Sequence, residues 1–407
     1  MIRNGALLSS VVWIEAAVAV VYLLAINRAL GPADYGAWSY AAACYIIVIA
    51  LISCGFESVA HFAYGGDRKR GDAVIAAALF WRIALGAGAC IAFAVYFAFR
   101  PPFDDSGWNA VLWVIAPAIL GRSLANLARA TLVGRSAVAR AAPISLALRG
   151  AEAVGAVALL AFGAPLVALA VLHASSWLAE GYLLLKRVAV SDRPILSRPD
   201  WRLTRDIARS GAPRAVIQGL LAVMVGAPLI LFEPRATAAD QVGYLAIAFQ
   251  TITIAVLTGQ TFINASSPSL AKHANAAGRV HWRYAALVGA ASLSLFALLA
   301  AMFQTTGEAI FIVAFGETFA DLAPLAVFAC VLGALQLAPN GLQQSLLATE
   351  RYAPGVIANL LGCAALFAGF HLTSGALTPI DAIWIISAAW AVRLIAMAVT
   401  ARLTPSS

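Results

Sequence analysis

Charged residues are scarce in this chain of 407 residues. Asp, Glu, Lys and Arg together make up 11% of it, whereas a soluble domain carries about 25%. Hydrophobic residues make up 62% of the chain, and no polar stretch between the apolar runs is long enough for a soluble domain. The composition excludes a soluble globular protein and favours an integral membrane protein.

Patterns for metal binding or nucleotide hydrolysis are also missing. The five cysteines all fall inside apolar runs without the spacing of a metal site, which is typical of small packing residues. The five histidines form no ligand pattern, and no Gly-x-x-x-x-Gly-Lys-Ser/Thr loop occurs. We therefore expect no metal, no cofactor and no ATP hydrolysis by this chain.

Long apolar runs repeat from end to end of the sequence. A bilayer core of about 30 Å needs about 20 apolar residues in a helix. By this criterion we predict an all-α polytopic membrane protein with about twelve transmembrane helices. The expected spans are 6–27, 38–60, 73–99, 109–133, 142–162, 164–185, 212–232, 242–264, 284–304, 321–343, 354–374 and 379–401.

Basic residues gather in alternate loops. The loops after the even-numbered spans hold most of them, including Arg68-Lys69-Arg70 and the long stretch after residue 185, whereas the other loops hold only Arg28, Arg100 and Arg235. Because cytoplasmic loops keep an excess of Lys and Arg, both termini are predicted to be cytoplasmic. Attraction to anionic lipids of the inner leaflet accounts for the net charge of +8 without any nucleic-acid partner.

The two halves of the chain resemble one another. "RALGPADYGAWSY" from residue 28 and "RATAADQVGYLAIA" from residue 235 share an Arg, an Ala-Asp and a Gly next to an aromatic residue, and a second pair of stretches repeats at nearly the same offset. This predicts parallel six-helix repeats around a central cavity. The expected domains are an N-terminal bundle over 1–189, a basic cytoplasmic linker over 190–211 and a C-terminal bundle over 212–407. Gly31-Pro32 predicts a turn between the first two spans.

Several short motifs, in order along nearly the whole chain, carry a family resemblance. "ALGPADYGAWSYAAACYIIVIALISCGF", "DQVGYLAIAFQ", "SPSLAKH" and "VAFGETFADLAPL" resemble the polysaccharide-transport flippases, which share a superfamily with multidrug and toxin extrusion exporters. Glu57, in "GFESVAHF", departs from the family pattern, which has an apolar or small residue there.

The resemblance implies a flippase, not an enzyme, in a bacterial cytoplasmic membrane. It would move an undecaprenyl-pyrophosphate-linked oligosaccharide, the repeat unit of a polysaccharide, to the outer leaflet by alternating access. Membrane lipids are the other expected partners, with a polysaccharide polymerase and chain-length proteins as further candidates.

Ionisable residues inside the spans are the candidate functional groups, because charge at membrane depth is expensive and is usually turned towards the interior of a bundle. An arginine holds a diphosphate well, since its planar fork binds two phosphate oxygens at once. We therefore predict substrate contacts at Arg82, Arg122 and Arg149. Carboxylates at Glu15, Glu57 and Glu152 are candidates for ion or proton coupling. Further ionisable residues in the spans are Arg129, Glu180 and Arg393.

Structural interpretations stay open beside these. Arg149 and Glu152 are three residues apart on one helix face and are equally suited to neutralise one another. Glu15 and Arg82 would form a buried bridge, and Arg129 would extend to the membrane surface. The functional alternatives are an ion-coupled exporter of small molecules and, with weaker support, a membrane polysaccharide polymerase or ligase.

Overall fold

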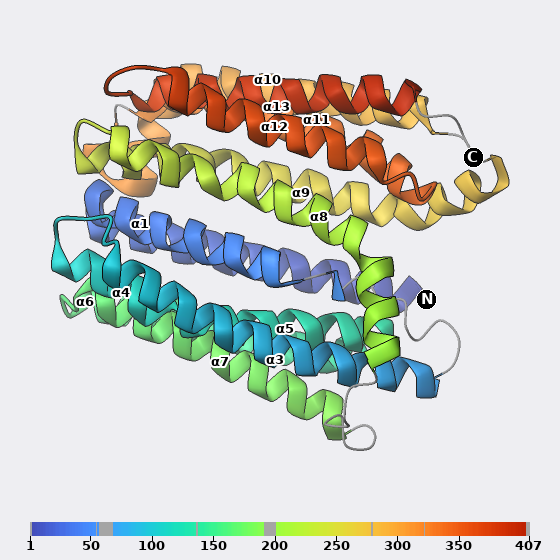
Figure 1. The fold of residues 1–407 in the computed structure, drawn as a ribbon. Helices are drawn as coiled ribbons and strands as arrows, with labels where there is room; N and C mark the ends of the chain where they lie inside the picture. The colour runs from blue at the N-terminus through green and yellow to red at the C-terminus, as the bar shows by residue number, and fades with distance from the viewer. Residues whose placement is uncertain are drawn as a thin grey trace. The chain divides into compact units, whose positions relative to one another are not determined.

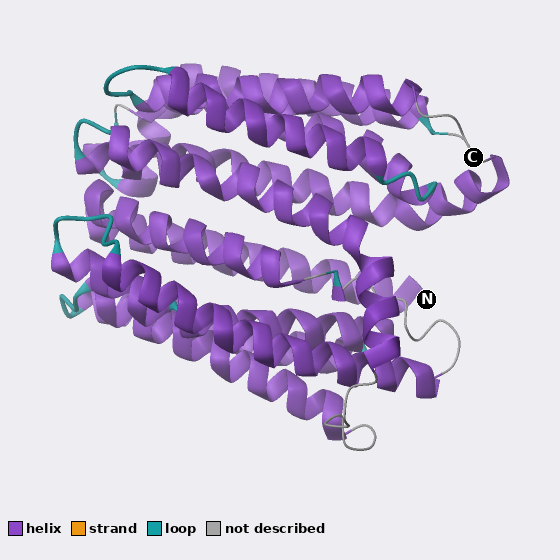
Figure 2. Ribbon diagram, viewed as in Figure 1, coloured by secondary structure: helices purple, strands orange, loops and turns teal. Residues whose placement is uncertain are grey.

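The computed structural model describes residues 2–53, 55–56, 68–135, 137–190, 201–277, 280–320 and 322–403. In these ranges the chain is almost entirely helical, and no strand forms apart from one isolated bridge between Ala236 and Leu377 (Figures 1 and 2). Eleven helices of the described chain are long and apolar enough to cross a membrane. The predicted fold class, an α-helical polytopic membrane protein, is confirmed.

The chain divides into two compact units. Unit 1 comprises residues 1–29 and 41–219, and unit 2 comprises residues 30–40 and 220–407. The boundaries therefore fall inside two helices, Ile2–Ser53 and Trp201–Phe232. The helices are α1 (Ile2–Ser53), α3 (Arg68–Phe99), α4 (Ser106–Ile115), α5 (Pro117–Gly134), α6 (Val138–Ala161), α7 (Leu166–Val190), α8 (Trp201–Phe232), α9 (Ala239–Ala277), α10 (Trp282–Phe315), α11 (Leu322–Ala348), α12 (Ala353–Leu372) and α13 (Pro379–Leu403).

The three predicted domains stay a prediction. Residues 191–200 of the expected linker lie outside the described residues, and the following residues begin α8.

The first two expected spans lie on two helical arms that together form α1. The spans 6–27 and 38–60 fall on opposite sides of Gly31, which is non-helical, with φ 71° and ψ 174°, and joins the two arms. That conformation suits glycine because it has no Cβ. Pro32 follows, and proline is tolerated in the first turn of a helix because its missing N–H would be unpaired there anyway. The second arm therefore starts directly after Gly31.

The two stretches that resemble each other in the sequence meet in unit 2. A Cβ added at Gly36 would lie 2.8 Å from the backbone nitrogen of Gly243, and one added at Gly243 would collide with the carbonyl of Pro32. Each glycine thus permits backbone to approach backbone at this point. The repeated Gly in the two sequence stretches has a packing role here.

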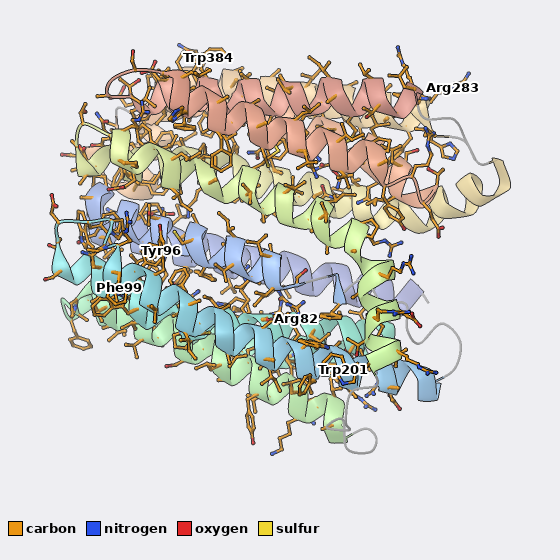
Figure 3. The ribbon with its side chains drawn as sticks, viewed as in Figure 1. Arg82, Tyr96, Phe99, Trp201, Arg283 and Trp384 are labelled. Carbon is orange, nitrogen blue, oxygen red and sulfur yellow. The ribbon has the colours of Figure 1, made fainter. Side chains whose placement is uncertain are left out.

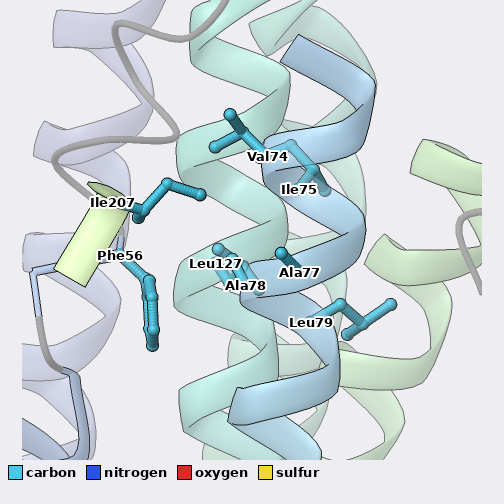
Figure 4. Packing of buried hydrophobic residues seen from close by; sticks show 8 residues of the cluster. All are labelled: Phe56, Val74, Ile75, Ala77, Ala78, Leu79, Leu127 and Ile207. Atoms are coloured by element: carbon cyan, nitrogen blue, oxygen red, sulfur yellow. The ribbon is translucent and has the colours of Figure 1, made fainter. Parts of the chain in front are cut away.

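Apolar side chains cover both the interior and the outside of the helices. In unit 1, Phe56, Ile75, Leu79, Leu127 and Ile207 belong to a buried cluster that joins α3 and α5 to the start of α8 (Figure 4). Other large apolar side chains are exposed, including Phe99 at 80% and Trp384 at 50% (Figure 3). An exposed apolar exterior is what contact with lipid tails requires.

Candidate functional site

A polar stripe runs along one face of α7 in the middle of unit 1. His173, Ser176, Trp177 and Glu180 follow one another at spacings of three, one and three residues, which puts them on one side of a helix. Trp177 and His173 are each 8% exposed and Glu180 is 0% exposed. The stripe faces the neighbouring helices, since its partners come from α1, α5 and α6.

Two glycines let α5 and α7 come close together beside this stripe. A Cβ added at Gly121 would lie 2.5 Å from the backbone nitrogen of Leu178, and one at Gly181 would lie 2.7 Å from the carbonyl oxygen of Gly121. Small residues at a crossing of membrane helices allow such close contact. The crossing brings the arginines of α5 within reach of the α7 stripe.

The indole of Trp177 lies among three guanidinium groups. The guanidinium carbon is 3.9 Å from the ring centroid for Arg149, 4.9 Å for Arg122 and 5.9 Å for Arg129. The ring face attracts cations, and the attraction is stronger where water is excluded. Trp177 therefore helps to hold three like charges in one small region.

Two buried carboxylates balance part of this charge. Glu180 forms ion pairs with Arg129 and, at 3.2 Å, with Arg149, and it accepts a hydrogen bond of 2.6 Å from Ser145. Glu152, 4% exposed, pairs with Arg149 at 2.5 Å. Arg149 thus bridges both carboxylates, as expected for a charge buried together with its partners.

His173 is held in one tautomer by its neighbours. Its Nε2 lies 3.1 Å from the indole nitrogen of Trp177, and an indole N–H only donates, so Nε2 is an acceptor. The proton is then on Nδ1, which donates to Glu152 at 2.6 Å. The Tyr45 hydroxyl donates to the same Nε2 at 2.9 Å and accepts from Arg122 at 2.9 Å. A proton on Nε2 would leave the indole N–H without its acceptor, so this arrangement favours neutral His173.

Arg122 differs from the other two arginines of the network because it has no carboxylate partner among the described residues. It is partly exposed, and its hydrogen bond goes to the Tyr45 hydroxyl. With neutral His173, the network holds three guanidinium groups against two carboxylates, and the excess positive charge falls on Arg122. Such a group is suited to bind an anion. No set of three or more His, Cys, Asp or Glu side chains fit for a metal occurs within the described ranges.

The three arginines predicted as substrate contacts lie in two places. Arg122 and Arg149 both lie over Trp177. Arg82, 0% exposed on α3, donates to Ser123 on α5 at 2.9 Å (Figure 3). Successive residues of a helix point about 100° apart, so Ser123 and Arg122 lie on different faces of α5. Arg82 therefore contacts one face of α5, and the Trp177 network contacts another.

Of the three carboxylates predicted for coupling, the structure describes the side chain of one. Glu152 lies in the network and forms the expected ion pair with Arg149. Glu57 and the side chain of Glu15 lie outside the described residues, so the proposed Glu15–Arg82 bridge is not placed. Their coupling role stays a prediction.

Sequence reasoning did not assign the stripe of α7 to the site. Glu180 stood out only as a charge inside a span, and Trp177, His173 and Ser145 were not singled out. A signal existed in the spacing of His173, Ser176, Trp177 and Glu180, which puts one aromatic and three polar side chains on one face of an otherwise apolar helix.

Unit 2 holds a smaller polar cluster. Arg393 on α13 is 0% exposed and donates through Nε to Asn359 of α12 at 2.6 Å and through Nη2 to Gln343 of α11. Both partners are neutral amides. Among the described residues Arg393 belongs to no ion pair.

Comparison with solved structures shows one recurring fold. A multidrug resistance MATE family transporter of the MOP superfamily, in an inward-facing conformation, matches with a TM-score of 0.73 at 16% identity, over 94% of this chain and 93% of that one. The lipid II flippase MurJ, in an inward closed conformation, matches with a TM-score of 0.71 at 11% identity, over 98% of this chain and 88% of that one.

A third solved structure has a similar fold. A MOP superfamily transporter from Pyrococcus furiosus, described as having a binding pocket of reverse polarity, matches with a TM-score of 0.64 at 15% identity, over 98% of this chain and 95% of that one. No protein-family model and no curated protein sequence matches the chain. At identities this low the likeness is one of fold, and it includes transporters of quite different substrates.

Proposed function

We propose that this protein is a membrane flippase for a lipid-linked substrate with an anionic headgroup. The specific substrate proposed is an undecaprenyl-pyrophosphate-linked oligosaccharide, moved from the cytoplasmic to the outer leaflet by alternating access. The observation that carries the proposal is Arg122, a partly exposed guanidinium without a carboxylate partner among the described residues, in a network with more arginines than acids.

The physical problem of such a substrate is its charge. A pyrophosphate moved unaided into hydrocarbon loses its hydration, and a buried ion without a partner is very unfavourable. A guanidinium replaces lost water with two parallel charge-assisted hydrogen bonds and stays charged at any physiological pH. Arg122 supplies that group, while the lipid tail needs only the apolar exterior that the helices already present.

The rest of the network serves to position Arg122. Arg149 is neutralised by Glu152 and Glu180, so it contributes less to anion binding than its charge alone suggests. Trp177 and the hydroxyl of Tyr45 fix the guanidinium of Arg122 from two sides. A binding group held in place beforehand loses little entropy when its ligand arrives.

The fold likeness supports the proposal only in part. MurJ is described as a lipid II flippase, which handles a lipid-linked substrate, but the MATE transporters with similar scores are described as multidrug resistance proteins. The charge of the unit 1 network supports the flippase, since cationic drugs favour sites with an excess of carboxylates.

The test measures lipid-linked repeat units in cells that lack this protein. We expect them to accumulate on the cytoplasmic side and to be cleared by the wild type. Arg122→Ala should clear them at least about tenfold more slowly, as expected for the loss of one charge-assisted interaction. Arg122→Lys should recover part of the rate, because a lysine keeps the charge but not the fork. Arg283→Ala, which removes an exposed arginine of unit 2, is the matched control (Figure 3).

Two results would contradict the proposal. If no lipid-linked species accumulates, the substrate class is wrong. If Arg122→Ala clears the intermediates as fast as the wild type at equal expression, Arg122 does not bind the headgroup.

The second candidate is an ion-coupled exporter of small molecules. It is favoured by the fold match to a MATE transporter and by the two buried carboxylates beside Tyr45 and Trp177, a combination that also suits a cationic aromatic compound. This candidate predicts that cells without the protein retain cationic dyes, and that Glu152→Gln abolishes their export. Dye retention unchanged by deletion would exclude it.

A further inference from the structure

Arg393 joins three helices of unit 2 without any opposite charge. Its Nε donates to Asn359 on α12 at 2.6 Å, its Nη2 donates to Gln343 on α11, and its guanidinium carbon lies 4.9 Å from the ring centroid of Trp390. The side chain is 0% exposed. Amide oxygens and an aromatic face solvate a cation in part, but they do not neutralise it.

No residue of the described chain supplies the missing negative charge. Arg393 belongs to none of the ion pairs found there. The thiol of Cys363, on the neighbouring helix α12, donates at 3.4 Å to the carbonyl of Leu220. A buried arginine left without a counter-charge strongly destabilises a protein, whereas one with a bound anion does not.

The unmet hydrogen-bonding capacity of this cluster consists mainly of donors. Nη1 of Arg393, Nε1 of Trp390 and Oγ of Ser387 are all buried without a hydrogen-bond partner. These residues are spaced by three along α13 and so share one side of the helix. Guanidinium and indole N–H groups only donate, and the amide oxygens nearby already accept from Arg393. The group that completes such a cluster is an acceptor with a negative charge. A water molecule would bring two donors of its own and no charge.

Close packing favours a small anion. A Cβ added at Gly362 would lie 3.1 Å from Cβ of Arg393 and 2.8 Å from the sulfur of Met224. Leu342, Leu346 and Met397, each within four residues of Gln343 or Arg393 along the chain, belong to a buried apolar core. A monatomic ion suits these surroundings better than a phosphate or an organic carboxylate.

We propose that unit 2 binds one inorganic anion of the size of chloride at Nη1 of Arg393. The ion neutralises the guanidinium and links α11, α12 and α13 through it. This site is separate from the Trp177 network of unit 1 and does not depend on the proposed transport function, because its occupant is a structural ion.

The first experiment follows the thermal unfolding of the full-length protein in detergent. Sodium gluconate is replaced stepwise by sodium chloride at constant ionic strength. A ligand that binds only the folded state raises the midpoint in a saturable way. We expect such a rise for the wild type and for the control Arg283→Met, and none for Arg393→Met. Arg393→Lys should need about tenfold more chloride, because it loses a fixed N–H donor.

The second experiment needs no variant. Crystals of the wild type grown with bromide in place of chloride are measured at the bromine absorption edge. An anomalous peak within hydrogen-bonding distance of Nη1 of Arg393 is expected. The proposal is overturned if bromide gives no peak there, if the wild type unfolds at the same midpoint in chloride and gluconate, or if Arg393→Met keeps the chloride effect.

Discussion

In unit 1, Glu180 accepts hydrogen bonds from Arg129 and Ser145 and forms an ion pair with Arg149, whereas in unit 2 Arg393 donates only to the amide oxygens of Gln343 and Asn359. Both arrangements place guanidinium groups against fully buried partners, since Glu180 in unit 1 and Asn359 in unit 2 are each 0% exposed. In unit 1 the charges neutralise one another, so removing one member leaves its partner without an opposite charge and destabilises the protein. In unit 2 the charge rests on neutral groups that lose only hydrogen bonds when it is removed.

This difference indicates where a ligand charge fits in each unit. In unit 1 most of the charge is already balanced, so an arriving anion finds one available group, Arg122, which is partly exposed. In unit 2 nothing among the described residues balances Arg393, and the side chain is fully buried. A ligand that comes and goes suits the first setting, and an ion that stays bound suits the second.

The largest effect is expected from Glu180→Gln. The change leaves Arg129 without its carboxylate and Arg149 with only Glu152. Breaking a buried ion pair by removing one partner lowers the free energy of unfolding by about 3–5 kcal/mol. Thermal and denaturant unfolding of the purified protein measure it.

Glu308→Gln is the matched control, because Glu308 is exposed in unit 2 and should change stability little. Replacing Arg129 by Met in the Glu180→Gln background should recover part of the loss. Equal stability of Glu180→Gln and the wild type would show that Glu180 does not hold the arginines of unit 1.

A direct comparison of the two units comes from Arg149→Met and Arg393→Met. The first leaves Glu152 and Glu180 with fewer partners, so we expect it to lower the free energy of unfolding by about 3 kcal/mol or more. The second leaves two amide oxygens short of a donor but also removes a buried charge that has no counter-ion among the described residues, so a loss of at most about 1 kcal/mol is expected in a buffer without chloride. The measurement is denaturant unfolding of both variants under identical conditions.

The order of the two effects matters more than their size. If Arg393→Met is the more destabilising in gluconate, amide partners hold a buried arginine as firmly as carboxylates do, and the contrast between the units fails. Adding chloride should widen the loss for Arg393→Met and leave that for Arg149→Met unchanged.

The sequence predicted the helices better than it predicted the site. Apolar runs locate membrane helices because the bilayer thickness fixes their length. The pair formed by Arg149 and Glu152 was also foreseen, since residues three apart on one helix are neighbours. The pairing of Glu180 with Arg129 was not, because it depends on how α5 and α7 cross at Gly121 and Gly181. Spacing within one helix carries no information on the register between two helices.

The first turn of the chain, in contrast, has a signal in the local sequence. Gly31-Pro32 predicts a turn between separate spans, and α1 consists of two helical arms that are separated at Gly31. Glycine and proline mark where helical geometry changes, and both occur at breaks and at loops. The packing of the second arm, where Gly36 meets Gly243, depends on the rest of unit 2 and has no such local signal.

The smallest effect is expected from Tyr45→Phe, which tests how Arg122, the arginine of the unit 1 network without a carboxylate partner among the described residues, is held. The change removes one hydroxyl that accepts from Arg122 and donates to His173, while the ring stays in its edge contact with the imidazole. His173 keeps its hydrogen bond from Trp177, so the loss should be about 1 kcal/mol in the free energy of unfolding. Tyr96→Phe is the matched control, because Tyr96 is 60% exposed and should show no measurable loss. An equal loss of stability in Tyr45→Phe and Glu180→Gln would contradict this expectation. Arg122 would then depend on Tyr45 as strongly as Arg129 depends on its carboxylate, and Arg122 would not be the available group that anion binding in unit 1 requires.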